Sequence, residues 1–252
     1  MKHEGASLLL AIQLLTRLPV RLSGLYSPAR MAASVRYYPL VGVLVGGVSA
    51  AVFMAADLLF PTALAVLFAI AAGLLFTGAF HEDGLADTFD GVGGGLTRDK
   101  ALQIMKDSRL GTYGTVALIL ALALKAATLM ALTPLFIPVA LIAAHGLSRL
   151  SSVLVIATSN YVRDEGTGKP VAGAASPTSL VVALITGAVI IAAWFFWSPA
   201  IAIVWALGGL ILGHCLMRLF FEPKLGGYTG DTLGAIQQAS EIGFYLGLVA
   251  WL

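Results

Sequence analysis

Acidic side chains gather in one short segment of this chain. Only 11% of all residues are charged, yet residues 81–91 contain four carboxylates, namely Glu82, Asp83, Asp87 and Asp90. If a helix runs through this segment, Asp83, Asp87 and Asp90 occupy positions i, i+4 and i+7 and share one face. Like charges on one face repel each other, which favours a cation between them, and carboxylate oxygens without nearby cysteine suit Mg²⁺ or Mn²⁺. The alternative is a solvated acidic loop that binds nothing.

Basic residues that could hold an anion follow in the same polar region. Lys106 and Arg109 are three positions apart and, on a helix, would share a face that can bind phosphate oxygens. Asp107, between them, is a further candidate metal ligand. The alternative is a basic patch that contacts lipid headgroups at the membrane surface.

Other polar features could belong to the same site. The glycine run 91–95 would let backbone N–H groups approach a phosphate, but it carries no Walker pattern and is equally compatible with a linker. Asp231 either caps the last helix or supplies a metal ligand from a second segment. The loop 159–179 combines Arg163 and a second cation with glycines, which suits phosphate contact or an ordinary basic loop. The role of His81 is open between base, ligand and interfacial residue.

The chain as a whole has the composition of a membrane protein. Apolar residues make up 59% of it and its mean hydropathy is +0.92, whereas soluble domains contain roughly 45–50% apolar residues. The net charge of +2 is too small to indicate nucleic-acid binding. Cys215 is the only cysteine, which excludes an intrachain disulfide and a cysteine-based zinc site.

Seven apolar stretches are long enough to cross a bilayer, which requires about 20 residues. They cover approximately residues 40–60, 62–80, 114–133, 138–158, 180–197, 200–219 and 233–252. A shorter apolar helix at 8–18, ended by Pro19, is expected to lie in the interface and to be retained rather than cleaved. We therefore predict an all-α polytopic membrane bundle, a single domain over residues 1–252, in which the helix at 62–80 continues into the acidic segment.

The connections between these stretches alternate in character. The short ones carry no charge, whereas the long ones, at 19–39, 81–113, 159–179 and 220–232, hold most of the lysines and arginines. The positive-inside rule places the long connections in the cytoplasm. The acidic segment is therefore expected at the cytoplasmic face of the membrane.

Three charges lie inside the apolar stretches, on Lys125, Arg149 and Glu241. A charge near the bilayer centre costs at least about 2.5 kcal/mol, so each of these side chains should face protein or a water-filled cavity. Glu241 is expected to pair with Lys125 or Arg149, and the sequence does not choose between them. The histidines outside the acidic segment are assigned to packing.

Together, these features predict phosphoryl or nucleotidyl transfer at the membrane surface. A divalent cation would bridge phosphate oxygens, and lysine or arginine would stabilise the developing charge. A carboxylate would receive the proton of the acceptor hydroxyl.

Three motifs resemble those of a known enzyme family. They are GAFHEDGLADTFDG at 78–91, IMKDSRLGTYG at 104–114 and GYTGDTLGA at 227–235, and LTRLP at 15–19 and YPLVG at 38–42 are also similar. The family is that of the cobalamin synthases, the adenosylcobinamide-GDP ribazoletransferases. The similarity runs from about Leu8 to the C-terminus.

The resemblance implies a Mg²⁺-dependent enzyme of the bacterial inner membrane that acts in the last steps of cobalamin biosynthesis. It would join adenosylcobinamide-GDP to α-ribazole, or to α-ribazole 5′-phosphate, and release GMP. The residues that the resemblance assigns to the site are Glu82, Asp83, Asp87 and Asp90 for the metal, Lys106 and Arg109 for the diphosphate, and Asp231 beside them. The expected partners are these small molecules and the lipid bilayer, without nucleic acid, and a homo-oligomer is left open.

Two other functions compete with this one. A CDP-alcohol phosphotransferase also holds metal with clustered aspartates at a helix end, but its signature continues into Ala-Arg, whereas here Gly91 is followed by Val92 and glycines. A cation transporter would carry carboxylates near the centres of several spans, and in this chain only Glu241 lies deep in one.

Overall fold

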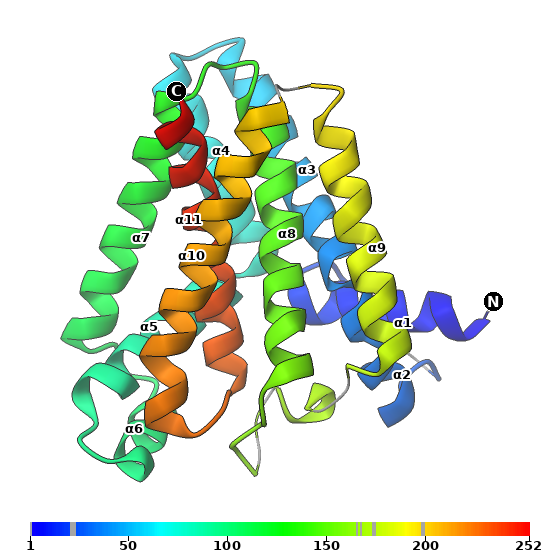
Figure 1. Ribbon diagram of the computed structural model, residues 1–252, viewed down its shortest axis with the longest axis vertical. Helices are drawn as coiled ribbons and strands as arrows, with labels where there is room; N and C mark the ends of the chain where they lie inside the picture. The colour runs from blue at the N-terminus through cyan, green and yellow to red at the C-terminus, as the bar shows by residue number, and fades with distance from the viewer. Residues whose placement is uncertain (1, 21–23, 165, 167, 173–174, 198–199) are drawn as a thin grey trace.

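The chain folds as a bundle of helices (Figure 1). The computed structural model describes residues 2–20, 24–164, 166, 168–172, 175–197 and 200–252. Within these ranges it contains no strand, only an isolated bridge between Tyr161 and Tyr228. The prediction of an all-α polytopic bundle is confirmed.

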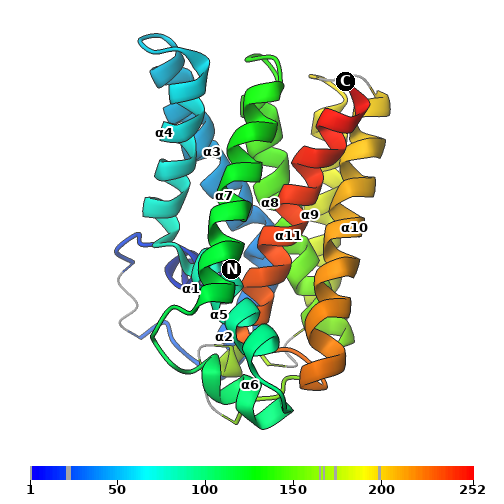
Figure 2. The same ribbon diagram turned by 90° about the vertical axis from the view of Figure 1, so that its left-hand side faces the viewer.

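Seven helices run along the long axis of the molecule (Figures 1 and 2). They are α3 (Tyr38–Asp57), α4 (Thr62–Thr77), α7 (Thr112–Ala131), α8 (Ile137–Thr158), α9 (Pro177–Trp194), α10 (Ala200–Leu225) and α11 (Gly230–Trp251). Each corresponds to one of the predicted apolar stretches, with ends that differ by up to six residues. The most buried of them are α8 and α11, which lie between the others and carry polar side chains into the core.

The predicted count of seven spans is not confirmed. In the described part of the chain, five helices are long and apolar enough to cross a membrane, or six if α4 and the bent helix after it count as one span. The helix α11 is not among them, because Gln237, Gln238 and Glu241 lower its hydropathy. It is nevertheless packed inside the bundle against α10, where those side chains find protein partners.

The helix of the second span does not continue into the acidic segment, which corrects the sequence-based expectation. α4 ends at Thr77, and a new helix, α5 (Phe80–Gly94), leaves it at 86°. Gly78 and Ala79 between them both have positive φ, 69° and 55°. Glycine adopts this left-handed φ without strain, and Gly78 is the C-cap of α4. α5 therefore runs across the bundle at a steep angle to α4.

Short helices and long connections gather at one end of the bundle (Figure 2). They include α1 (Lys2–Leu15), α2 (Pro28–Ser34), α6 (Arg98–Ile104) and the 3-10 turns η1 (Val35–Tyr37) and η2 (Lys169–Val171). α1 is longer than the predicted helix at its N-terminal side and ends three residues earlier. This polar end comprises the connections that the sequence groups as long and basic, and the opposite end holds the short ones.

Close helix contacts depend on small residues. Gly42 and Gly46 of α3 lie against the backbone of α8, at His145 and Leu141, and a Cβ at either glycine would overlap it. The sequence predicts such an approach from the spacing of these two glycines. The contact between α3 and α8 is one of the most extensive in the bundle.

Candidate active site

The acidic helix α5 crosses the first turns of α11 at two glycines. A Cβ at Gly84 would lie 2.6 Å from the carbonyl oxygen of Asp231, and a Cβ at Gly234 would lie 2.9 Å from that of His81. Backbone therefore rests on backbone, since neither position leaves room for a side chain. This crossing joins the acidic segment to Asp231, although 140 or so residues separate them in sequence.

The carboxylates of Asp83 and Asp87 on α5 and of Asp231 on α11 lie near this crossing, close enough to act on one another electrostatically. Burial, together with the negative charges of Asp231 and Asp83, raises the pKa of Asp87 to about 7. The helical register expected for Asp83 and Asp87 holds within α5, so both project from one face. The role of Asp231 as a metal ligand from a second segment stays a prediction.

Asp231 is not the cap of α11, in contrast to one interpretation of the sequence. Thr229 is the N-cap: its hydroxyl accepts a hydrogen bond from the Thr232 amide at 3.2 Å, and the Thr232 hydroxyl accepts one from the Thr229 amide at 2.8 Å. This reciprocal capping box satisfies the helix end. The carboxylate of Asp231 is thereby left for other partners, and it contacts Arg163, whose Nη1 lies 2.7 Å from Oδ2.

The residues at the crossing fit a hard divalent cation. Three carboxylates and one guanidinium leave an excess of negative charge in a partly buried place, and carboxylate oxygens are the donors that Mg²⁺ prefers. In the described part of the chain, no group of three or more His, Cys, Asp or Glu side chains is already arranged to hold a metal ion. The fit therefore rests on donor chemistry and charge.

Asp90 has a defined structural task. Its side chain is buried, and its two oxygens accept hydrogen bonds from the backbone amides of Gly111 at 2.7 Å and Gly114 at 2.8 Å. These amides belong to the N-terminus of α7, whose free N–H groups favour a carboxylate. Asp90 thus fastens α5 to α7, and its negative charge still acts on Asp87. A direct metal contact by Asp90 stays a prediction.

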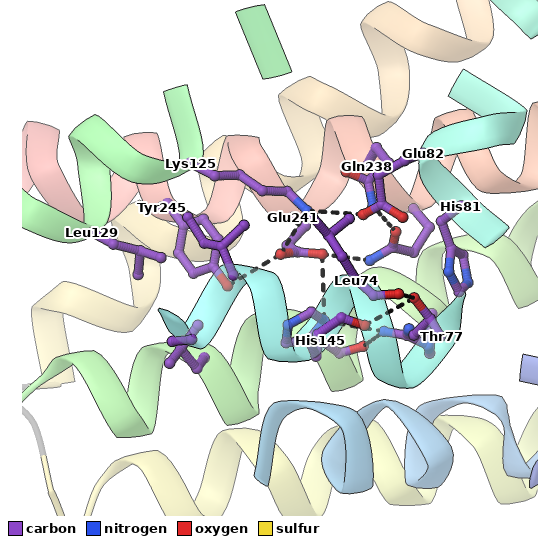
Figure 3. Close-up of a pocket in the computed structure, with 16 residues that line it drawn as sticks. Leu74, Thr77, His81, Glu82, Lys125, Leu129, His145, Gln238, Glu241 and Tyr245 are labelled. Carbon is purple, nitrogen blue, oxygen red and sulfur yellow. Dashed lines mark hydrogen bonds and ion pairs between the residues drawn. The ribbon is translucent and has the colours of Figure 1, made fainter. Parts of the chain in front are cut away.

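Glu82 lies inside the bundle, where it lines a pocket beside Gln238 (Figure 3). Its Oε1 accepts a hydrogen bond from Gln238 at 2.8 Å and lies 3.7 Å from the ammonium of Lys125. Successive residues on a helix are about 100° apart, so Glu82 cannot share the face of Asp83. The structure therefore separates Glu82 from the other residues that the sequence assigns to the metal.

A buried charged cluster lies behind Glu82 (Figure 3). Glu241 pairs with Lys125 at 3.0 Å, accepts a hydrogen bond from Gln237 at 2.6 Å and lies 3.5 Å from Nδ1 of His145. Of the two partners that the sequence left open, Lys125 is the one observed. The cluster borders a cavity of about 20 Å³, which has room for about one water molecule.

The assignment of the remaining histidines to packing alone is wrong for two of them. The imidazole of His145 contacts Glu241. The carbonyl oxygen of His145 accepts a hydrogen bond from the guanidinium of Arg149 at 3.0 Å. Nδ1 of His214 lies 2.7 Å from the hydroxyl of Ser151. These partners come from other turns or helices, so local sequence gave no signal for them.

Lys106 and Arg109 do not share a helical face. α6 begins after its N-cap Thr97 and ends at Ile104, before both residues. The side chain of Arg109 is 87% exposed and its guanidinium lies 2.6 Å from the carboxylate of Asp107, which lowers the pKa of Asp107 to about 2. This contact does not place Arg109 beside Asp83, Asp87 or Asp231. Their proposed part in binding a diphosphate stays a prediction.

The glycine run forms neither a phosphate loop nor a linker. Gly91 to Gly94 are the last residues of α5. A Cβ at Gly91 would overlap Met105, and one at Gly95 would lie 2.5 Å from the backbone nitrogen of Ala101. The glycines therefore let α5 pack closely against α6, and Met105 is buried in that contact.

Arg163 is the basic residue that the structure adds to the site. The amide of Val162 donates to the Tyr228 carbonyl at 3.0 Å, and the amide of Tyr228 donates to the Asn160 carbonyl at 2.8 Å. These two bonds pin the loop after α8 beside the segment before α11, which brings Arg163 to Asp231. The sequence marks this loop only as compatible with phosphate contact.

Comparison with known proteins gives a consistent result. The sequence profile of the family described as cobalamin-5-phosphate synthase matches residues 7–249. A protein of Leptothrix cholodnii named adenosylcobinamide-GDP ribazoletransferase is 44% identical, covering 98% of this chain and 96% of its own. Proteins with the same name from Shewanella frigidimarina and Ralstonia pickettii are each 42% identical, covering 95% and 100% of this chain and 92% and 98% of their own. No solved structure matches the chain.

Proposed function

The chain belongs to the cobalamin-5-phosphate synthase family, and on this basis we propose that it joins adenosylcobinamide-GDP to α-ribazole or α-ribazole 5′-phosphate and releases GMP. The observation that carries the proposal is the meeting of Asp83, Asp87 and Asp231 where α5 crosses α11. Transfer between a diphosphate and a hydroxyl needs negative charge to be offset and a proton to be removed. The crossing offers residues for both tasks.

Asp83, Asp87 and Asp231 would hold Mg²⁺ in this proposal. When bound, the cation offsets the negative charge of the diphosphate and makes its phosphorus more electrophilic. Asp231 is positioned by the α11 N-terminus, where a carboxylate is also favoured by the helix dipole. Asp83 and Asp87 are held at the crossing by the close contact of Gly84 with α11.

The proton of the acceptor hydroxyl would pass to a carboxylate of the site that does not hold the cation, because a bound cation keeps its ligands ionised. The oxygen of a free ribose hydroxyl of the ribazole forms a bond to the corrinoid-side phosphorus while its proton passes to that carboxylate. The bond from that phosphorus to the bridging oxygen breaks, and GMP leaves with the electron pair.

The polar end of the bundle, with this site, would face the cytoplasm of a bacterial inner membrane. The long connections that hold most of the lysines and arginines all lie at this end. Both substrates are bulky, charged or strongly polar molecules, so approach from the aqueous side is the direct route. The apolar surfaces of α9 and α10 would face lipid.

Purified protein with Mg²⁺, adenosylcobinamide-GDP and α-ribazole should release GMP, and EDTA should stop the reaction. Asp83→Asn and Asp87→Asn should each lower the rate at least about 100-fold, because each removes a charge on which the cation depends. Both variants should still be recovered from the membrane in folded form, as judged by size-exclusion chromatography.

Asp57→Asn is the matched control, because Asp57 lies near the opposite end of the bundle and bonds only with Thr62 in the described part of the chain. Its rate should stay within about two-fold of the unmodified protein. Near-normal turnover by Asp87→Asn would contradict the proposal. CDP-diacylglycerol in place of the corrinoid substrate tests the phosphotransferase alternative in the same assay.

A further inference from the structure

Arg163 is a buried cation whose donors are mostly unused. Only 9% of its side chain is exposed, and Nη1 lies 2.7 Å from Oδ2 of Asp231. Its Nε and Nη2 are buried and have no hydrogen-bond partner in the described part of the chain. Arginine stays protonated in proteins, so these N–H groups cannot be removed by titration. Buried donors without partners are costly, which indicates that something absent from the folded chain completes them.

The orientation of the guanidinium suits a phosphate. Nη1 is paired with Asp231, which leaves Nε and Nη2 as the remaining donors of the planar guanidinium. Such a planar fork matches two oxygens of one phosphate group, whereas lysine offers only a point charge. The loop that carries Arg163 is anchored by two backbone hydrogen bonds around Tyr228, so the guanidinium is presented by a fixed segment of the chain.

The charges at the crossing also favour Arg163 as the group that binds phosphate. The positive charge of Arg163 lowers the pKa of Asp87, opposing burial and the neighbouring carboxylates. A cation bound there would cancel the remaining negative charge, and a diphosphate arriving at it would bring new negative charge. Arg109, which the sequence favoured for this task, is exposed and is engaged by Asp107. Arg163, by contrast, already pairs with Asp231, one of the three carboxylates.

We propose that Arg163 binds the diphosphate of the nucleotide-linked substrate through Nε and Nη2, while Asp231 orients its guanidinium. The proposal rests on the function given above, because it assigns a residue to the substrate of that reaction. Anion binding is thereby assigned to the loop after α8, which carries Arg163, and not to the loop after α6. Lys106 and Arg109 then contact solvent or lipid headgroups.

The first test measures GMP release against the concentration of the GDP-linked substrate. Arg163→Met should raise KM at least about ten-fold, and Arg163→Lys should recover part of the loss, because it restores charge without the fork. Arg218→Met is the matched control, since Arg218 also lies at the polar end and pairs with an acidic residue, Glu222, on its own helix. Its KM should stay within about two-fold. Arg109→Met tests the loop after α6 in the same assay, and a rise in KM confined to Arg109→Met would overturn the proposal.

The second test does not depend on turnover. Inorganic diphosphate with Mg²⁺ should raise the thermal unfolding temperature of the unmodified protein and of Arg218→Met, but not that of Arg163→Met. Equal stabilisation of all three proteins would overturn the role of Arg163, even if GMP is released normally. If the unmodified protein releases no GMP from the corrinoid substrate, loss of diphosphate binding in Arg163→Met would still support the anion site. That outcome would count only against the proposed reaction.

Discussion

At the scale of single residues, the site depends on which way neighbouring side chains point. The spacing of Asp83 and Asp87 predicts a shared face, and the structure places both on α5 toward Asp231. Glu82, adjacent in sequence, turns instead to Gln238 and Lys125. The sequence shows how many acidic residues a segment contains but not which way their side chains point. That direction depends on how the helix packs against its neighbours.

The titration of Asp87 gives a prediction at this scale. Its folded-state pKa of about 7 lies above the ordinary aspartate value of 3.8. The stability that the protonated form contributes is therefore present at low pH and is lost as pH rises from about 4 through about 7. In EDTA, the thermal unfolding temperature should fall over this range, and it should fall less in Asp87→Asn, which does not titrate.

Magnesium should reverse that loss, because the cation and the proton compete for the same carboxylates. Stabilisation by Mg²⁺ should be larger at pH 8 than at pH 5.5 in thermal unfolding measured on detergent-solubilised protein. The same Mg²⁺ effect at both pH values would show that Asp87 is not among the ligands.

The position of Arg163 marks a limit of sequence-based prediction at the same scale. Its partner Asp231 is 68 residues away, and the bonds that bring the two together are backbone hydrogen bonds between irregular segments. Such bonds carry no residue-type signature. The weak signal available was a cation in a glycine-containing loop at the polar end.

At the scale of helices, the arrangement of α5 decides whether a site exists. Aspartate-rich sequence gives the helix, but its direction comes from the bend at Gly78 and Ala79 and from two glycine contacts with α11. The bend was not predicted, because Gly78-Ala79 looks like an ordinary pair of small residues in an apolar run. The guanidinium of Arg17, which lies against Gly78, comes from a different part of the chain. The apolar stretches themselves were predictable from hydropathy alone.

The buried cluster behind Glu82 holds three helices together. Lys125 of α7 lies between Glu82 of α5 and Glu241 of α11. Breaking a buried ion pair by removing one partner leaves an uncompensated charge, which is why such groups hold a particular arrangement of helices. The charges within spans, predicted to face protein, therefore support the base of α5 from inside the bundle.

The crossing of α5 and α11 gives a prediction for this scale. Gly84→Ala should lower GMP release at least about ten-fold, because its Cβ would sit 2.6 Å from the Asp231 carbonyl oxygen and force the helices apart. The measurement is the steady-state rate at saturating substrate and Mg²⁺.

Gly94→Ala on the same helix is the control, since its nearest contact would be an ordinary 3.7 Å to Ile104. It should keep its rate and gain slightly in stability, because alanine is about 0.5–1 kcal/mol better than glycine in a helix. Equal activity of the two variants would mean that the close approach of α5 to α11 is not needed for the reaction.

At the scale of the whole molecule, composition and the alternation of loops were sufficient to predict a polytopic bundle with one polar end. The number of spans was not, because α11 is too polar to be recognised by hydropathy, while α4 is too short to count alone. Both departures concern helices that serve the site. The two helices that hydropathy alone does not count as spans, α4 and α11, are therefore helices that position the site.

The orientation of the bundle can be tested with single cysteines in a Cys215→Ser background. Leu96→Cys lies at the polar end and Leu58→Cys at the opposite end, where the native side chains are 94% and 84% exposed. A membrane-impermeant maleimide added to intact spheroplasts should label Leu58→Cys, and Leu96→Cys should react only after the membrane is opened. The reverse pattern would place the carboxylates outside the cytoplasm.

The length of α4 has a consequence for where the reaction takes place. Sixteen helical residues rise about 24 Å, whereas the hydrocarbon layer is about 30 Å thick. If α4 starts at the outer boundary, its last turn stops short of the inner headgroups, and the transverse helix that follows sits in a shallow depression of the inner leaflet. A substrate with a broad ring system and a charged tail could then keep its ring at lipid level while its phosphates reach the aspartates.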